Sequence, residues 1–169
     1  MSSLFNFTPE DNTALVQPKS IIQEQCDELL KLTNNLVIGK IEEYDGPIDS
    51  YKSNFASTIA SSLQQEFDVQ TELGDVSENS FTYEFYLSSK YTPKFKYRVL
   101  FINYGITYYP LKIVLDETIA TQIGCENTIQ LENESEFKTV LGKILNSDKL
   151  KSVINSLFAL NVQELQKDF

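Results

Sequence analysis

Histidine is absent from this chain of 169 residues. Without imidazole, the commonest general base, the standard nucleophile-activating triads and most zinc sites are excluded. The two cysteines, Cys26 and Cys125, lie far apart and neither has a CxxC partner, which excludes a structural zinc site built on thiolates. The six glycines stand singly, so no GxGxxG or P-loop pattern occurs. We therefore expect no cofactor.

Long apolar runs are absent as well. No stretch approaches the roughly 20 apolar residues that a membrane-spanning helix requires. The first residues, MSSLFNFTPEDN, lack the basic segment and the apolar segment of a secretion signal. Cys26 falls within an apolar stripe of helical period, which indicates a buried, reduced thiol. We therefore expect a cytoplasmic protein that does not contact membranes.

Basic residues are few relative to acidic ones: 14 Lys and Arg against 24 Asp and Glu give a net charge of −10. Such a surface repels nucleic-acid phosphates and anionic lipid and favours basic partners. The charge is uneven, because acidic residues outnumber basic ones in residues 1–50, whereas the charged residues of 85–115 are all basic. Length and a hydrophobic content of 41% fit one ordered domain. We expect an N-terminal arm over residues 1–17 and a single domain over residues 18–169.

Residues 80–117 carry most of the aromatic side chains and predict three consecutive antiparallel strands. Apolar and polar residues alternate in the first strand, with Phe81 and Phe85 on one face, as in a sheet that covers a core. If the odd-numbered residues of the second strand share that face, Glu84 lies opposite Arg98 or diagonal to it. We expect these two residues to form a modest surface ion pair.

The third of these strands contains Tyr109–Pro110. Proline cannot donate a hydrogen bond to a strand ladder, so an edge position or a bulge is predicted there. Before it, Tyr104–Gly105 predicts a tight turn with a positive φ at the glycine. A bulge at the proline would turn three apolar residues inward: Leu111, Ile113 and Leu115.

Helical periodicity precedes the strands. The first helix is predicted to start near Pro18, where Ser20 and Gln23 have the spacing of a capping box. Its apolar stripe continues past Gly39, and we favour a helix that extends through Ile41 and Tyr44 over a short strand there. A second helix is predicted to begin at Asp49 or Ser50, followed by a short strand over residues 69–73.

Helical periodicity also follows the strands. Residues 118–124 are ambiguous between a short helix and a strand, and residues 128–132 predict a last short strand. Asn133 and Ser147 are candidate N-caps of two amphipathic helices. Elements segregated in this way predict an α+β fold, an antiparallel meander of four or five strands flanked by two N-terminal and two C-terminal helices.

Three groups of residues are candidates for function. The first is carboxylate chemistry, since paired Asp and Glu can hold Mg²⁺ or act as acid and base without histidine. Asp116 and Glu117 end an apolar strand, and Glu84 is a candidate neighbour. A strand that ends in solvent also ends commonly in charged residues, so this spacing by itself is not diagnostic.

The second group is a basic aromatic patch. Interleaved basic and aromatic side chains stack on bases and contact phosphates, but aromatics also fill strands and lysines protect strand edges. The net charge argues against nucleic acid, and the same patch suits an acidic protein. The patch comprises Lys90, Tyr91, Lys94, Lys96 and Arg98.

The third group is an acidic set in the N-terminal part of the chain. Such residues either present a negative face to a basic partner or form the solvated side of a helix. They are separated by polar residues, which argues against mimicry of DNA. The acidic set comprises Glu24, Asp27, Glu28, Glu42, Glu43 and Asp45.

These features predict a non-enzymatic cytoplasmic protein-binding module, such as an acidic adaptor, inhibitor or immunity-type protein, with a basic protein as its partner. One alternative is an acidic secretion-type chaperone that holds extended clients, which implies a homodimer with an apolar groove. The other is a metal-dependent enzyme that uses the carboxylates at the strand end.

Overall fold

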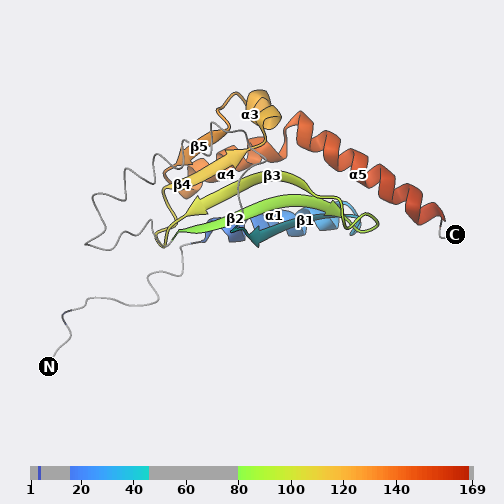
Figure 1. Ribbon diagram of the computed structural model, residues 1–169, viewed down its shortest axis with the longest axis horizontal. Coiled ribbons are helices and arrows are strands. Elements are labelled where there is room, and N and C mark those ends of the chain that lie inside the picture. Colours follow the sequence, from blue (N-terminus) through green and yellow to red (C-terminus); the bar gives the residue numbers. More distant parts are fainter. Residues whose placement is uncertain (1–3, 5–15, 46–79, 168–169) are drawn as a thin grey trace.

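A five-stranded antiparallel sheet is the centre of the fold (Figure 1). The computed structural model describes Leu4, residues 16–45 and residues 80–167. Each strand pairs with its neighbours in chain order, which confirms the predicted antiparallel meander. The strands are β1 (Val37–Glu43), β2 (Phe81–Ser89), β3 (Tyr97–Tyr104), β4 (Leu111–Leu115) and β5 (Thr128–Leu131).

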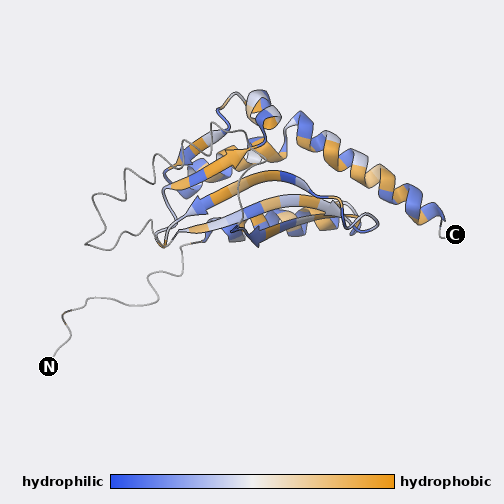
Figure 2. Ribbon diagram, in the orientation of Figure 1, coloured by the Kyte–Doolittle hydropathy of each residue, from blue (hydrophilic) through white to orange (hydrophobic). Residues whose placement is uncertain are grey.

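Helices cover one face of this sheet. In the described part of the chain they are α1 (Pro18–Leu32), α3 (Glu117–Ile123), α4 (Glu134–Leu145) and α5 (Asp148–Lys167). Apolar residues of α1, α4 and α5 join those of the strands in one core, and α5 extends beyond the sheet (Figure 1). Figure 2 shows apolar residues along much of β4 and alternating with hydrophilic ones on α5. The α+β fold is thus as predicted.

Two elements of the prediction cannot be compared with the structure. The helix predicted from Asp49 or Ser50 and the strand predicted over residues 69–73 lie outside the described residues. Most of the arm predicted over residues 1–17 lies outside them too.

The predicted start of the first helix is right in position, but the predicted cap is wrong. Pro18 is the first helical residue and Gln17 is the N-cap, whose side chain makes no capping hydrogen bond. Ser20 therefore lies inside the helix, where its backbone N–H donates to Gln17 O at 3.0 Å. Proline at the first position explains the site of initiation, since its φ is already helical and it has no N–H to satisfy.

The prediction that this helix continues through Ile41 and Tyr44 is wrong. Asn34 and Asn35 have φ values of 53° and 64°, a left-handed backbone that asparagine tolerates and that ends α1. The chain then returns as β1 beneath the helix it has just left. A Cβ on Gly39 would lie 2.9 Å from Cys26 Sγ, so the glycine permits the close approach of β1 to α1.

A β-bulge between β2 and β3 changes the predicted faces of the sheet. Phe85 is opposite Leu100, but the next residue, Tyr86, is opposite Arg98, so Val99 is the extra residue on β3. Beyond the bulge, even-numbered residues of β3 such as Leu100 face the core together with odd-numbered residues of β2. The assumption that odd residues of both strands share the core face therefore fails after Arg98.

The prediction of an edge position or a bulge at Pro110 is also wrong, because β4 has a regular register on both sides. β4 is an interior strand, paired with β3 on one side and β5 on the other. Pro110 lies just before it, so the ladder loses no donor. The turn before it is longer than predicted, and the positive φ, 71°, belongs to Tyr108. The predicted inward set is confirmed as fully buried: Leu111, Ile113 and Leu115.

The C-terminal helices begin where the sequence indicates. Asn133 Oδ1 accepts a hydrogen bond from the backbone N–H of Glu136 at 2.9 Å at the start of α4. Ser147 Oγ accepts one from the backbone N–H of Leu150 at 3.3 Å at the start of α5. The ambiguous segment after β4 forms the helix α3. The two C-terminal helices and the last short strand are thus confirmed.

Candidate functional site

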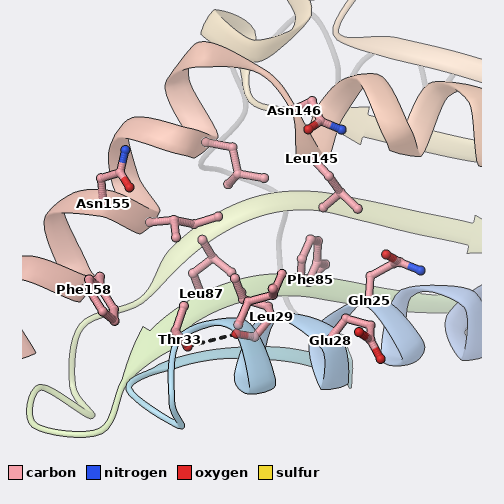
Figure 3. Close-up of a pocket in the computed structure, with 13 residues that line it drawn as sticks. Gln25, Glu28, Leu29, Thr33, Phe85, Leu87, Leu145, Asn146, Asn155 and Phe158 are labelled. Atoms are coloured by element: carbon pink, nitrogen blue, oxygen red, sulfur yellow. Dashed lines mark hydrogen bonds between the residues drawn. The ribbon is translucent and has the colours of Figure 1, made fainter.

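A groove with a volume of about 540 Å³ lies between α1 and α5 on the helical face of the sheet (Figure 3). Its floor is β2 and one end is closed by the C-terminus of α4. Eight of its thirteen lining residues are apolar. The lining comprises Gln25, Glu28, Leu29, Leu32, Thr33, Phe85, Leu87, Leu145, Asn146, Leu150, Ile154, Asn155 and Phe158.

The floor and walls follow from simple periodicities. Phe85 and Leu87 are two apart on β2 and therefore point to the same face, where both are buried. On α5, Leu150, Ile154 and Phe158 recur at intervals of four and form one wall. On α1 the wall ends at Leu32, whose side chain is 79% exposed. The groove is therefore apolar from its buried floor to its open rim.

The polar groups of the walls are mostly engaged within the protein. Thr33 Oγ1 lies 2.9 Å from Leu29 O and accepts a hydrogen bond from the N–H of Val37 at 3.1 Å. Asn146 Nδ2 donates to a carbonyl of α4 at 2.8 Å. Glu28 is the one ionisable residue among the lining residues, and it forms an exposed ion pair of 2.9 Å with Lys31. This lining provides no pair of groups for acid and base chemistry.

The acidic set is divided between different surfaces. Its first three members are exposed on α1. On β1, residues alternate between faces, so Glu43 lies on the same face as Gly39, beneath α1, and Glu42 lies on the opposite face. Asp45 follows the end of β1. The acidic residues of α1 therefore form one part of this set and Glu42 belongs elsewhere.

The basic aromatic patch is also divided. Lys90, Tyr91 and Lys94 lie in the connection between β2 and β3, and Lys90 Nζ is 5.5 Å from the centroid of the Tyr91 ring. Asn161 of α5, which is fully buried, accepts a hydrogen bond from the Tyr91 N–H at 3.0 Å and fixes this connection to the helix. Sequence reasoning missed Asn161, although a polar residue inside an apolar stripe was the signal.

The other two members of the patch are held by Glu84. Lys96 Nζ donates to Glu84 Oε1, and Arg98 Nε donates to Oε2 at 2.9 Å. Lys96 Nζ also lies 4.3 Å from the centroid of the Tyr86 ring. The predicted pairing of Glu84 with Arg98 is confirmed, but its description as a modest surface pair is wrong, because Glu84 is only 4% exposed.

Asp116 and Glu117, two of the carboxylates predicted to bind a metal, lie at the start of α3. Asp116 Oδ1 caps the helix by accepting hydrogen bonds from the N–H groups of Thr118 and Ile119, at 2.8 and 3.2 Å. Its Oδ2 accepts one from the Tyr97 hydroxyl at 3.0 Å. Glu117 is exposed in the first turn. Across the described residues, no group of three or more Cys, Asp and Glu side chains is placed to hold a metal ion.

The cysteines are unsuited to nucleophilic chemistry. Both are free thiols. Burial raises the pKa of Cys26 to about 12, and burial also raises the pKa of Cys125 above its ordinary value. Because the thiolate is the reactive form, neither side chain is activated at neutral pH.

Comparison with known proteins identifies no relative of this chain. No protein-family model, no curated protein and no solved structure matches it. The helices in the described ranges include none that is long and apolar enough to cross a membrane. The groove and the charges around it are therefore the features of the molecule that bear on its function.

The place of the groove between α1 and α5 was not predicted. On the first helix, Leu32 lies outside the apolar stripe that contains Cys26, and an apolar residue outside the buried stripe was the available signal. The opposite wall was predicted only as part of an amphipathic helix. How far α5 stands from α1 is a property of tertiary packing, which periodicity within one helix does not determine.

Proposed function

We propose that the protein is a non-enzymatic protein-binding module whose groove between α1 and α5 receives an amphipathic segment of a basic partner protein. The observation that carries this proposal is the apolar lining, which runs from Phe85 and Leu87 on the floor to the exposed side chain of Leu32 at the rim. Amphipathic segments bind other proteins by placing an apolar row into such a groove.

The chemistry of the lining favours a protein partner over a small polar substrate. The volume, about 540 Å³, would suit either. Small-molecule sites, however, add a few convergent polar groups that fix the orientation of the ligand. Here Thr33 and Asn146 are engaged with backbone groups of the protein, and Glu28 is paired with Lys31. The side-chain amides of Gln25 and Asn155 are the other polar groups of the lining, and the remaining eight residues provide apolar contact area.

The charge of the protein supports a basic partner. The net charge is −10, and Glu24, Asp27 and Glu28 are exposed on α1, the helix that forms one wall. Charges at the rim of an interface chiefly raise the association rate and select among partners, while the apolar contacts slow dissociation. We expect lysine and arginine residues to flank the apolar row of the partner.

The cytoplasm is the compartment that we propose, because both cysteines are free and disulfides are rare there. Adaptor, inhibitor and immunity protein remain alternative roles for such a module. The secretion-type chaperone is a narrower form of the same proposal, in which the groove holds an extended client.

The test compares two exposed leucines. Leu32→Glu places a charge in the groove, whereas Leu160→Glu, at a residue 40% exposed on α5, changes the surface outside it. A partner captured from the native host with the parent chain should be basic, and it should bind the Leu160→Glu variant equally well. Loss of one buried leucine contact should weaken the Leu32→Glu complex about 10- to 100-fold in calorimetry with the purified partner.

Three outcomes would overturn the proposal: no stoichiometric partner, an acidic partner, or equal binding by the Leu32→Glu variant. Circular dichroism of both variants shows whether the fold is retained. The same titration with peptides from the partner distinguishes a helical ligand from an extended one, since only the helical ligand gains helical signal on binding. An extended ligand would favour the chaperone role.

A further inference from the structure

The outer edge of β1 carries open backbone groups. Lys90 N donates to Leu36 O at 3.0 Å and Tyr44 N donates to Thr82 O at 2.9 Å. These pairs, together with the register between β1 and β2, show that even-numbered residues of β1 bond to β2. The N–H and C=O groups of odd-numbered residues therefore point away from the sheet. In residues 16–45 and 80–167, no other strand lies along this side of β1.

The open part of this edge has a defined length. At its N-terminal end, Thr33 Oγ1 accepts a hydrogen bond from Val37 N at 3.1 Å and lies 3.3 Å from Val37 O. This side chain occupies the position that a neighbouring strand would take. With respect to the described residues, the groups of β1 that are left open are those of Gly39, Ile41 and Glu43. Edges of this kind are templates for a further strand.

We propose that a second copy of this chain pairs antiparallel with β1, with Ile41 of both copies on the twofold axis. In this register Gly39 of one copy is opposite Glu43 of the other and Ile41 is opposite Ile41, so every open N–H and C=O of the edge finds a partner. A twofold interface between identical strands is isologous and closes after two copies.

Charge selects the same register independently. With Ile41 on the axis, Lys40 of each copy is directly opposite Glu42 of the other. Shifting the axis to Lys40 brings two lysines together, and shifting it to Glu42 brings two glutamates together. Either shift also leaves open groups unpaired. Lys40 and Glu42 form non-hydrogen-bonded pairs in this ladder, in which opposite side chains approach most closely.

The second copy also complements a like-charge contact within the sheet. Glu42 lies directly opposite Glu84 of β2. Glu84 is neutralised by Lys96 and Arg98, whereas Glu42 lies beside the Tyr86 hydroxyl. Lys40 of the second copy would bring a cation to Glu42 from the open side of β1.

The N-terminal end of α1 leaves room for this pairing. The Tyr104 hydroxyl of β3 donates to Gln17 Oε1 at 3.4 Å, and Lys19 Nζ lies 5.0 Å from the centroid of the Tyr83 ring of β2, so this end of the helix reaches over β2 and β3. There the helix is set inward from the edge, and Ile41, which is half-buried, can meet its copy. Because the contact is one short strand pair, we expect a reversible dimer rather than an obligate one.

Sedimentation equilibrium over a wide range of concentrations tests the proposal. The parent chain should pass from 19.3 kDa to twice that mass as concentration rises. Ile41→Pro removes an outward N–H but no hydrogen bond to β2, so it should stay monomeric with an unchanged circular dichroism spectrum. Leu32→Glu, in the groove on the other side of α1, should dimerise like the parent.

A charge exchange tests the register. Lys40→Glu and Glu42→Lys each place like charges opposite one another and should each raise the dimer dissociation constant about tenfold. The double variant restores opposite charges at unchanged net charge and should dimerise like the parent. A parent that stays monomeric, an Ile41→Pro variant that still dimerises, or a double variant as weak as the single ones would each overturn the proposal.

Discussion

Replacing Gly39 by alanine tests how closely α1 packs on β1. The added Cβ would lie 2.9 Å from Cys26 Sγ and 3.3 Å from Cys26 Cβ, and the first distance is too short for unstrained contact. Overpacking of this kind costs about 1–3 kcal/mol. Alanine in a strand recovers about 0.5–1 kcal/mol of backbone entropy relative to glycine. We therefore expect a net loss of about 0.5–2 kcal/mol in the free energy of unfolding.

A double-mutant cycle with Cys26→Ala isolates the contact. Without the sulfur atom, the closest obstacle to the new Cβ is gone, and Gly39→Ala should become neutral or slightly stabilising. The coupling between the two substitutions should be about 1–3 kcal/mol. Gly142→Ala is the matched control, because a Cβ there meets nothing within 4 Å and alanine is the better helix former.

Urea unfolding followed by circular dichroism measures all four variants of the cycle and the control. For a chain of this length, 1 kcal/mol corresponds to a shift in melting temperature of about 2–4 °C. An equal effect of Gly39→Ala with and without Cys26 would refute the argument, since the cost would then have another source. So would a loss of stability in Gly142→Ala as large as that in Gly39→Ala.

Two further predictions concern buried ionisable groups. Glu84→Gln should lower the free energy of unfolding in urea by about 2–4 kcal/mol, because it leaves two cations without their buried anion. Glu28→Gln, in an exposed pair, should change this free energy by less than about 0.5 kcal/mol. Equal effects would contradict the burial of Glu84. Burial raises the pKa of Tyr86 and of Cys26 to about 12. The folded protein therefore retains protons that the unfolded chain releases, so stability is full below about pH 9 and falls as pH rises towards 12. Urea unfolding at several alkaline pH values measures this, and a stability that rises over that range would refute it.

Features that depend on a few neighbouring residues could be predicted from the sequence. Asn133 and Ser147 are side chains that reach the third backbone N–H beyond them, and each caps a helix as expected. Alternation placed Leu111, Ile113 and Leu115 on the buried face. The order of helices and strands then led to the α+β fold, because sequential antiparallel strands have few other arrangements.

The failures have specific causes. The stripe that ends α1 continues in register through Ile41, so hydrophobic period alone could not distinguish a longer helix from a strand. Asn34 and Asn35 decide the matter by adopting a left-handed backbone, a conformation that asparagine tolerates but does not dictate. Gly39, which was placed inside the predicted helix, is instead a residue of β1 at which the strand passes close to Cys26.

The burial of Glu84 depends on the bulge and on the second face of the sheet. The register places Glu84 opposite Phe101 on β3, and Phe101 opposite Val114 on β4. Phe101 and Val114 are 1% and 4% exposed, so this face is as buried here as the helical one. A charged residue on such a buried face requires counter-ions on the same face. The bulge provides one, because it places Arg98 opposite Tyr86, two residues from Glu84 on the same face of β2.

This burial also limits where a partner can bind. The basic residues Lys96 and Arg98, which the sequence offered as a docking patch, are engaged by Glu84 and by aromatic rings. Breaking those contacts to bind an external anion would leave the buried Glu84 carboxylate unpaired. The free energy lost in this way is larger than the free energy gained from an exposed contact with the anion. The two interactions that we propose avoid that cost because they use other surfaces: the apolar groove between α1 and α5, and the outer edge of β1. The groove offers side-chain contact area and the edge offers backbone hydrogen bonds, so in these proposals a second copy and a basic partner would not compete for one surface.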